Sequence, residues 1–257
     1  MPLAALVPLA RAAGFEGLSM RASQLSVETP VTEGAAARRL LDEAGLEVSM
    51  VMGNVALAAN TPDAPHALRD IGPHLDLAER LRSRLVRVML QTAADIPAAQ
   101  RAADEAAERG ITLAQQTHWG TLAETVDEAE ALVRAVGRAN FGITFEPANL
   151  LACGSAHGAD AVSRLAPHIV NVYFQNVRVK PGSVHTFKTR RRGAVAIEYL
   201  PLDDPSGIGL PPLIEALRRA DYRGWVSVHQ PLREGQSVAD AITEAARVFG
   251  PLVQRNA

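Results

Sequence analysis

Apolar and polar positions follow two patterns along the chain, one typical of amphipathic helices and one typical of buried strands. Helical segments carry an apolar residue every three or four positions, and strand segments are short uninterrupted apolar runs. Helices are predicted at residues 2–13, 32–43, 63–81 with a break at Gly72 and Pro73, 96–109, 121–136, 159–165, 211–219 and 238–253. Strands are predicted at residues 16–21, 47–52, 85–90, 111–114, 141–145, 169–174 and 225–229. A strand-like run at 194–199 is expected to belong to a hairpin on the rim.

Strands and helices that alternate in this way form a parallel sheet covered by helices. About seven strands are predicted, one fewer than in a (β/α)8 TIM barrel. Because the chain begins on a helix, the missing or atypical strand is expected to be the first, either absent from this sequence or replaced by another closure. A doubly wound open sheet is the alternative, but the chain contains no glycine-rich phosphate loop. We therefore expect an α/β chain with a single (β/α)8 TIM-barrel domain over residues 1–257.

Polar side chains follow two neighbouring strands at the point where each strand ends. Gln115–His118 come directly after the run 111–114, and Glu146–Asn149 follow the run 141–145. A helix between the two strands makes a right-handed βαβ unit, which brings both polar clusters to the same edge of the sheet. That edge is where α/β folds place their active sites.

The composition narrows the kind of protein. The chain has 257 residues, 47% of them hydrophobic, and a formal net charge of −2. This charge gives no indication of nucleic-acid or membrane-surface binding. The single cysteine, Cys153, rules out an internal disulfide and favours a reducing, cytoplasmic setting. No apolar run reaches the roughly 18 residues of a membrane helix, so no membrane association is expected.

Four segments together resemble the xylose isomerase-like TIM-barrel superfamily, the sugar phosphate isomerase/epimerase group. They are AGFEGLSMR at 13–21, ITLAQQTHWGTL at 111–122, FGITFEPANLLACG at 141–154 and LPPLIEALRRADYRGWVSVHQ at 210–230. The resemblance implies a barrel and a divalent metal held by two Glu, one Asp and one His at strand ends. It also implies an enzyme that shifts a proton next to a sugar carbonyl, with the metal polarising adjacent oxygens.

The residues at the four implied ligand positions all differ from the family pattern. Gln116 and His229 stand in place of the two Glu, Glu146 replaces Asp, and Tyr173 replaces His. The expected metal ligands are Glu146, His229 and the Gln116 carbonyl, with Mn²⁺, Zn²⁺ or Mg²⁺ as the ion. The imidazole favours Zn²⁺, whereas the hard cations gain most from carboxylates.

The resemblance also assigns roles to residues around these positions. We expect His229 to act as the base, Glu146 as an acid or ligand, and His118 to orient the substrate. The expected substrate-binding residues are Gln116, Asn149, Tyr173, Gln175 and Arg21. Three of these residues have an alternative role: Glu146 as a salt-bridge partner of Arg21 or Arg87, Tyr173 as a core residue, and His118 as a loop residue. The other histidines of the helices and loops, His66, His74, His157 and His168, are expected at the surface.

Three functions fit these residues. The first is an isomerase or epimerase acting on a small sugar or keto acid. The second is a lyase or dehydratase that begins with the same proton abstraction. The third is a non-catalytic barrel that binds a sugar or a partner and has lost its metal site. A homo-oligomer is an open expectation.

A basic run, Lys188 and Arg190–Arg192, interrupts the pattern after the sixth predicted strand. An arginine there can hold a phosphate, a carboxylate or a sugar hydroxyl, and the alternative is a solvated loop. The run is short and lacks interleaved aromatic residues, which argues against nucleic acid as a partner.

Overall fold

The computed structural model of the protein describes residues 1–253, which belong to two compact units. The first unit contains Met1–Gln115 and Val133–Gly142, and the second contains Gln116–Leu132 and the chain from Ile143 onward. Each unit is described by itself. The predicted single domain over 1–257 stays a prediction, and its last four residues, 254–257, lie outside the described part of the chain.

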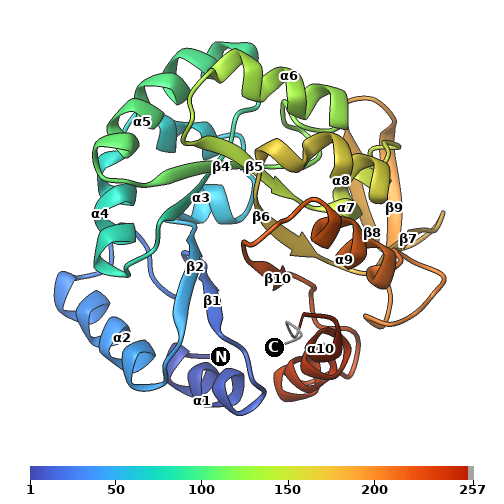
Figure 1. The fold of residues 1–257 in the computed structure, drawn as a ribbon, viewed down its shortest axis with the longest axis horizontal. Helices are drawn as coiled ribbons and strands as arrows, with labels where there is room; N and C mark the ends of the chain where they lie inside the picture. Colours follow the sequence, from blue (N-terminus) through green and yellow to red (C-terminus); the bar gives the residue numbers. More distant parts are fainter. Residues whose placement is uncertain (254–257) are drawn as a thin grey trace. The chain divides into compact units, whose positions relative to one another are not determined.

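The first unit is a parallel α/β arrangement with strand order β1-β2-β3-β4. Its elements are α1 (Leu3–Ala12), β1 (Gly17–Met20), α2 (Val31–Glu43), β2 (Glu47–Val51), α3 (Val55–Ala58), η1 (Ala64–Leu68), α4 (Gly72–Arg80), β3 (Leu85–Val88), η2 (Ala93–Asp95), α5 (Ile96–Glu108) and β4 (Thr112–Gln116). Helices α2, α4 and α5 lie along one side of these strands (Figure 1). All four residues of β3 are buried, as expected for a strand covered on both faces.

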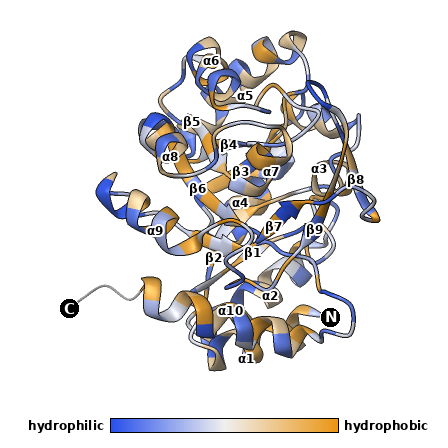
Figure 2. Ribbon diagram, turned by 90° about the vertical axis from the view of Figure 1, so that its right-hand side faces the viewer, coloured by the Kyte–Doolittle hydropathy of each residue, from blue (hydrophilic) through white to orange (hydrophobic). Residues whose placement is uncertain are grey.

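The second unit continues the same alternation with strand order β5-β6-β10, again all parallel. Its elements are α7 (Pro147–Ala152), α8 (Ala159–Leu165), η3 (Ala166–His168), β6 (Ile169–Phe174), β7 (Val177–Val179), β8 (His185–Thr189), β9 (Gly193–Tyr199), α9 (Leu210–Arg219), β10 (Val226–Val228) and α10 (Val238–Val253). Helix α6 (Val126–Val136) and strand β5 (Phe141–Phe145) contain residues of both units, and so does β4, whose last residue, Gln116, belongs to the second unit. Hydrophilic and hydrophobic residues alternate along α9 and α10, which gives each an apolar face (Figure 2).

A three-stranded antiparallel sheet, in the order β7-β9-β8, accompanies the parallel strands of the second unit. The strand-like run at 194–199 is β9 of this sheet, so the predicted hairpin is confirmed and its partner is β8. Strand β7 was not predicted. The residues of the hairpin turn, from Thr189 to Gly193, contain the three arginines of the basic run.

The alternation of strands and helices predicted from the pattern is largely confirmed. The residues described contain seven parallel strands and begin with helix α1, as the pattern indicates. The predicted helix 63–81 is interrupted before Pro73: η1 ends at Leu68 and α4 starts at Gly72, with proline in its first turn. Two short helices, α3 and α7, were missed because four and six residues are too few to show a helical period.

One predicted helix begins later than expected. Residues 121–125 do not extend α6, which starts at Val126. The Thr125 hydroxyl accepts the backbone N–H of Glu128 at 3.2 Å, as an N-cap does. The Thr121 hydroxyl instead donates to the His118 carbonyl at 2.7 Å and accepts the N–H of Ala123 at 3.1 Å. These side-chain bonds fold the segment into a loop, since threonine hydroxyls compete with helical backbone bonds.

His74 is buried, and the prediction that it lies at the surface is wrong. It sits in α4 with only 3% of its surface exposed, next to Gly53, where no side-chain carbon would fit against the imidazole ring. Burial lowers the pKa of His74 to about 4, partly offset by the charge of Asp70. The ring is therefore neutral in the folded protein at neutral pH.

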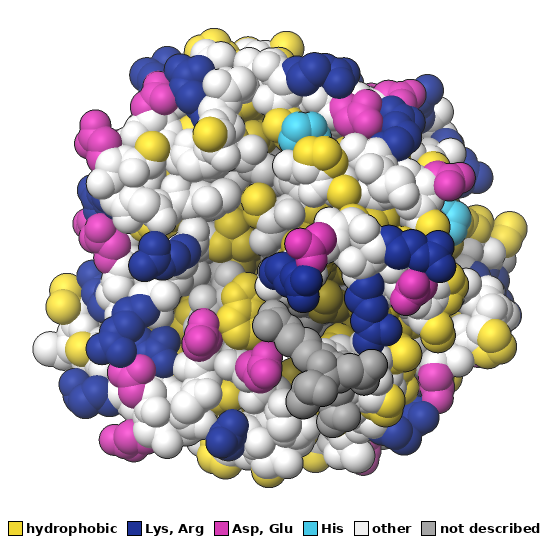
Figure 3. Space-filling model, in the orientation of Figure 1, with side chains coloured by type: hydrophobic (Ala, Val, Ile, Leu, Met, Phe, Trp, Pro, Cys, Tyr) yellow, Lys and Arg dark blue, Asp and Glu magenta, His cyan; other side chains and the backbone are white. Residues whose placement is uncertain are grey.

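The described residues contain no helix that is both long and apolar enough to cross a bilayer. On the face shown in Figure 3, basic and acidic side chains are interspersed.

Candidate functional site

The predicted site residues of the second unit lie at the carboxyl ends of its parallel strands. Gln116 is the last residue of β4, and Glu146 directly follows β5. Gln175 and His229 directly follow β6 and β10. Because parallel strands share one direction, their ends bring these four side chains to one edge, as the sequence predicts.

The Glu146 carboxylate is the centre of this group. It is fully buried, and its Oε2 atom accepts hydrogen bonds from the Gln116 amide and from Asn149 Nδ2, the latter at 2.7 Å. Its Oε1 atom lies 3.4 Å from Nδ1 of His229. Hydrogen bonds of this kind are what a buried carboxylate requires to remain charged.

Thr117 fixes the backbone around Glu146, a role that the sequence did not single out. Its hydroxyl accepts the N–H of Glu146 at 2.8 Å, and its own N–H bonds to the Thr144 carbonyl at 3.0 Å. The Thr117 carbonyl accepts the second amide hydrogen of Asn149 at 2.8 Å. Asn149 thus spans from the end of β4 to the Glu146 carboxylate. In the sequence, the only indication of this role was the position of Thr117 between two predicted site residues, Gln116 and His118.

The contacts of His229 decide which of its ring nitrogens is the base. Gln175 Nε2 lies 2.8 Å from the His229 carbonyl oxygen and 3.3 Å from Nδ1, so its better bond is to the carbonyl. Nδ1 is then left to donate its hydrogen to Glu146. In this tautomer, assigned from the hydrogen-bond geometry, Nε2 carries the lone pair that can accept a proton.

Only the imidazole of this pair reaches solvent. The His229 side chain is 23% exposed and the Glu146 side chain is 0% exposed. The imidazole stacks on the fully buried Tyr173, with ring centroids 4.4 Å apart and planes at 26°. A ring held on one face by Tyr173 and on one edge by Glu146 and Gln175 has little freedom to turn.

The charges around Glu146 act on its ionisation. Burial alone raises the pKa of the carboxyl group, but its hydrogen bond with His229 and the positive charges of His229 and His118 lower it further than burial raises it. The net effect holds the pKa of Glu146 below its ordinary value. Glu146 is therefore a carboxylate placed to stabilise a positive charge on His229, and its expected role as an acid or a ligand stays a prediction.

His118 lies beside this group, but its own contacts are with the loop. Its Nδ1 is 2.8 Å from the Trp119 carbonyl, and 3% of its surface is exposed. Trp119 in turn stacks on Phe187 of β8, with ring centroids 4.0 Å apart. The loop that follows β4 is thereby connected to the antiparallel sheet. Substrate orientation by His118 stays a prediction.

Two more side chains complete the description. Burial, together with the negative charge of Glu146, raises the pKa of Tyr199 to about 12, so its phenol keeps its proton. Arg21 belongs to the first unit, where its Nη2 donates to the Ala58 carbonyl at 3.1 Å. Its expected role in substrate binding stays a prediction.

The residues expected to bind a metal were tested against their geometry. Gln116 directs its amide nitrogen to Glu146, whereas a metal shared by the two residues needs the carbonyl oxygen of Gln116. The Oε2 atom of Glu146 already accepts two amide hydrogens. No group of three or more His, Cys, Asp or Glu suited to a metal ion occurs between residues 1 and 253. The arrangement of Glu146, His229 and Gln116 does not fit a divalent cation.

Comparisons with known proteins agree with the fold. A family model described as xylose isomerase-like TIM barrel matches residues 7–251. The rhizopine catabolism protein MocC of Rhizobium meliloti is 28% identical over 262 residues, covering 88% of this chain and 74% of that protein. The inosose dehydratase of Geobacillus thermodenitrificans (strain NG80-2) is 26% identical over 129 residues, covering 50% of this chain and 43% of that protein.

Among solved structures, a xylose isomerase-like TIM barrel protein from Mycobacterium smegmatis in complex with magnesium superposes with a TM-score of 0.72. The match covers 98% of this chain and 89% of that protein at 17% sequence identity. An identity this low shows the similarity of the fold alone.

Proposed function

The chain belongs to the xylose isomerase-like TIM barrel family, and from this premise we propose that it is an enzyme that moves a proton next to the carbonyl group of a small sugar or keto acid. The observation that carries the proposal is the pairing of a fully buried carboxylate, Glu146, with a partly exposed imidazole, His229. A buried carboxylate that orients an imidazole and stabilises the positive charge it takes up is a standard way to make histidine a general base.

The reaction begins at Nε2 of His229. This nitrogen takes a proton from the carbon next to the substrate carbonyl, and the electron pair of the broken C–H bond forms a C=C bond to the carbonyl carbon. The carbonyl oxygen takes up the negative charge. Glu146 stabilises the imidazolium that results, since its Oε1 faces Nδ1.

In isomerisation, His229 gives its proton to the former carbonyl carbon. The hydroxyl proton on the neighbouring carbon passes through solvent to the oxygen that had taken up the negative charge, and the neighbouring carbon becomes the new carbonyl. A single base can perform both transfers on one face of a planar enediol intermediate. Inversion at one carbon needs a second proton carrier on the opposite face. The described residues of the site supply one partly exposed acid/base group, the imidazole of His229, which supports isomerisation more directly than epimerisation with inversion.

Elimination is the second candidate, because His229 alone can remove the first proton and then protonate the departing hydroxyl group. After the first proton transfer, the bond between the next carbon and its hydroxyl group breaks, and His229 gives its proton to the departing oxygen, which leaves as water. The product is an unsaturated ketone. The similarity to a protein described as inosose dehydratase supports this candidate.

No step of this reaction is assigned to a metal, because the donor groups do not fit one. The amides of Gln116 and Asn149 instead keep the Glu146 carboxylate in place. Gln116, Asn149, Tyr173 and Gln175 are proposed to form the wall that positions the substrate and the base.

Product analysis tests the proposal. The protein is incubated with inosose, with a ketohexose and with hydroxypyruvate, and the products are followed by NMR. An isomeric carbonyl compound assigns isomerisation, and an unsaturated ketone assigns elimination. The His229→Asn variant is expected to lose roughly a hundred- to ten-thousand-fold of either activity. His168→Gln, a histidine of the same unit outside the site, is the matched control. Equal activity of His229→Asn and the control would overturn the assignment of the base.

A further inference from the structure

The basic run in the turn between β8 and β9 has no part in the proposed reaction. Its three arginines make different contacts. Arg190 is bound to the loop that follows β4, whereas Arg191 and Arg192 line a surface hollow beside α7. The turn is therefore more than a solvated loop.

A buried carboxylate holds this turn in place. Glu124 is 0% exposed, and its Oε1 accepts the N–H of Arg190 and the N–H of Gly120, each at 2.7 Å. Arg190 also donates from Nη1 to the Thr121 carbonyl at 2.9 Å. A turn tied by these bonds presents its remaining side chains from a fixed position, which lowers the entropic cost of binding.

Arg192 is also positioned by the chain around it. Its N–H donates to the Thr189 hydroxyl at 2.9 Å, and its Nη1 donates to the Ala152 carbonyl at 3.2 Å. The side chain packs over Gly154, where an added Cβ would lie 2.8 Å from the Arg192 Cδ atom. Gly154 has a φ of +75°, a conformation that favours glycine, so this close approach suits the residue.

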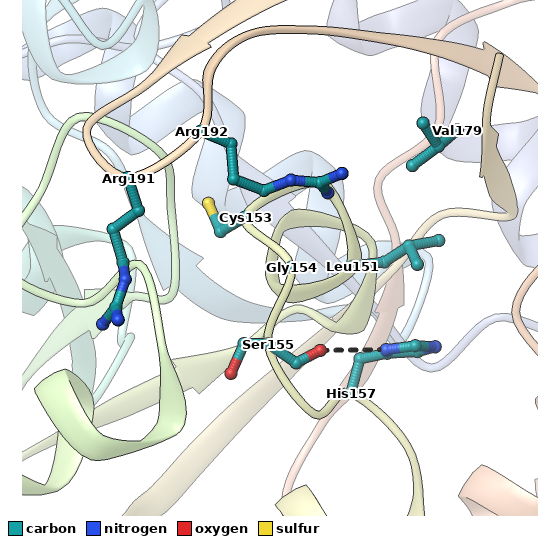
Figure 4. Close-up of a pocket in the computed structure, with 8 residues that line it drawn as sticks. All are labelled: Leu151, Cys153, Gly154, Ser155, His157, Val179, Arg191 and Arg192. Carbon is teal, nitrogen blue, oxygen red and sulfur yellow. Dashed lines mark hydrogen bonds between the residues drawn. The ribbon is translucent and has the colours of Figure 1, made fainter.

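The hollow has a volume of about 640 Å³, and the charged side chains that line it are the two arginines. Arg191, Arg192, Ser155 and His157 line it together with the apolar Leu151 and Val179. Figure 4 shows Arg192 extending over Gly154, with Ser155 and His157 across from it. None of the described residues that line the hollow is Asp or Glu. Burial, reinforced by the nearby Glu124 and Glu128, raises the pKa of Cys153 to about 12, so its thiol is neutral.

From these contacts we propose that the hollow is a binding site for a small oxyanion, a phosphate or a carboxylate group. The guanidinium group of Arg192, which extends over Gly154, supplies charge-assisted hydrogen bonds. Arg191, whose side chain points away from that of Arg192 in Figure 4, adds positive charge at the edge of the hollow, and Ser155 and His157 supply further polar contacts. Among the described residues neither arginine takes part in an ion pair, and the bond from Arg192 Nη1 is to a neutral carbonyl, that of Ala152, so both positive charges are available to a ligand.

The site is separate from the proposed reaction centre and does not depend on it. Glu146 precedes α7 and Cys153 follows it, so a helix of six residues, roughly 9 Å long, lies between the two. An anion bound here contacts a different end of α7 from the one that carries Glu146.

The test measures binding of inorganic phosphate and of acetate by isothermal titration at constant ionic strength. Constant ionic strength is needed because salt screens interactions between exposed charges. The wild-type protein is compared with Arg191→Gln and Arg192→Gln, which remove a charge from the hollow. Lys188→Gln is the matched control, since it removes the same charge from the same run but does not line the hollow. Thermal unfolding without anion checks that each variant folds.

We expect saturable binding to the wild type and to Lys188→Gln, and binding about tenfold weaker for each arginine variant. Preference for phosphate assigns a phosphate-bearing ligand, and equal binding of acetate assigns a carboxylate; either result supports the proposal. The absence of saturable binding to the wild type would overturn it. An equal loss of anion binding in Lys188→Gln would also overturn the proposal, because the net positive charge of the run would then account for the binding.

Discussion

At the residue scale, the environment of Glu146 explains why one carboxylate can suffice in this site. Its partners are the neutral amides of Gln116 and Asn149 and the imidazole of His229. Amides satisfy the carboxylate without neutralising it, so its charge remains available to the histidine. The positions of Glu146 and His229 were predictable because each follows an apolar strand. The role of Thr117 could not be predicted, because it depends on a hydrogen bond between the residues that follow β4 and β5.

Burial of His74 leads to a prediction about stability at acid pH. The pKa of His74 is lowered to about 4, whereas an unfolded histidine titrates near 6.5. Between these values the unfolded chain binds a proton that the folded chain does not, so stability falls as pH falls from 6.5 to 4. The loss is expected to reach about 3 kcal/mol.

This prediction is checked by urea unfolding between pH 4 and 7 for the wild type, His74→Gln and His66→Gln. His66 is exposed and serves as the control. The stability of His74→Gln should decline less steeply with acid than that of the control. Identical slopes in all three proteins would show that His74 does not remain neutral.

At the element scale, the loop after β4 and the β8–β9 hairpin act as one assembly in the second unit. Glu124 bonds to both, and Trp119 stacks on Phe187. The sequence predicted the hairpin from its apolar pattern but extended α6 back to residue 121. Hydrophobic periodicity cannot show that Thr121 and Glu124 bond to loop backbone, since such bonds depend on segments far apart in the chain.

A double-mutant cycle measures this assembly. Trp119→Leu and Phe187→Leu are expected to show a coupling free energy of about 0.5–1.5 kcal/mol in unfolding, because stacked aromatic pairs contribute that much beyond burial. Trp119→Leu combined with Phe249→Leu is the control, since Phe249 contacts Phe174 instead. Additive effects in the first pair would show that the loop and the hairpin are energetically independent.

At the scale of the whole molecule, the alternation of strands and helices made the fold predictable. Short apolar runs separated by amphipathic segments lead to parallel strands in sequence order, and the described residues have this order in each unit. The family match extends over residues 7–251. The metal expectation was harder to judge from sequence, because the family resemblance supplies ligand positions but not the direction in which the Gln116 amide points.

Elemental analysis addresses the metal at this scale. Protein purified without chelator is expected to contain well under one Mn, Zn or Mg per chain, since the donor geometry does not fit such an ion. Chelator treatment should leave the thermal midpoint and the activity unchanged. A stoichiometric metal that disappears in both Glu146→Ala and His229→Ala would contradict this and restore a metal-assisted reaction.

In the proposed reaction, His229, supported by Glu146, removes a proton next to a substrate carbonyl. Solvent deuterium exchange measures this step directly, whatever product follows. The proton held by the partly exposed imidazole of His229 exchanges with solvent, so in D₂O the wild type is expected to place deuterium on the carbon next to the carbonyl of inosose or another substrate that it accepts. The rate should fall roughly a hundred-fold or more in His229→Asn, and less in Glu146→Gln, which keeps the imidazole. Exchange in His229→Asn at the wild-type rate would contradict the account.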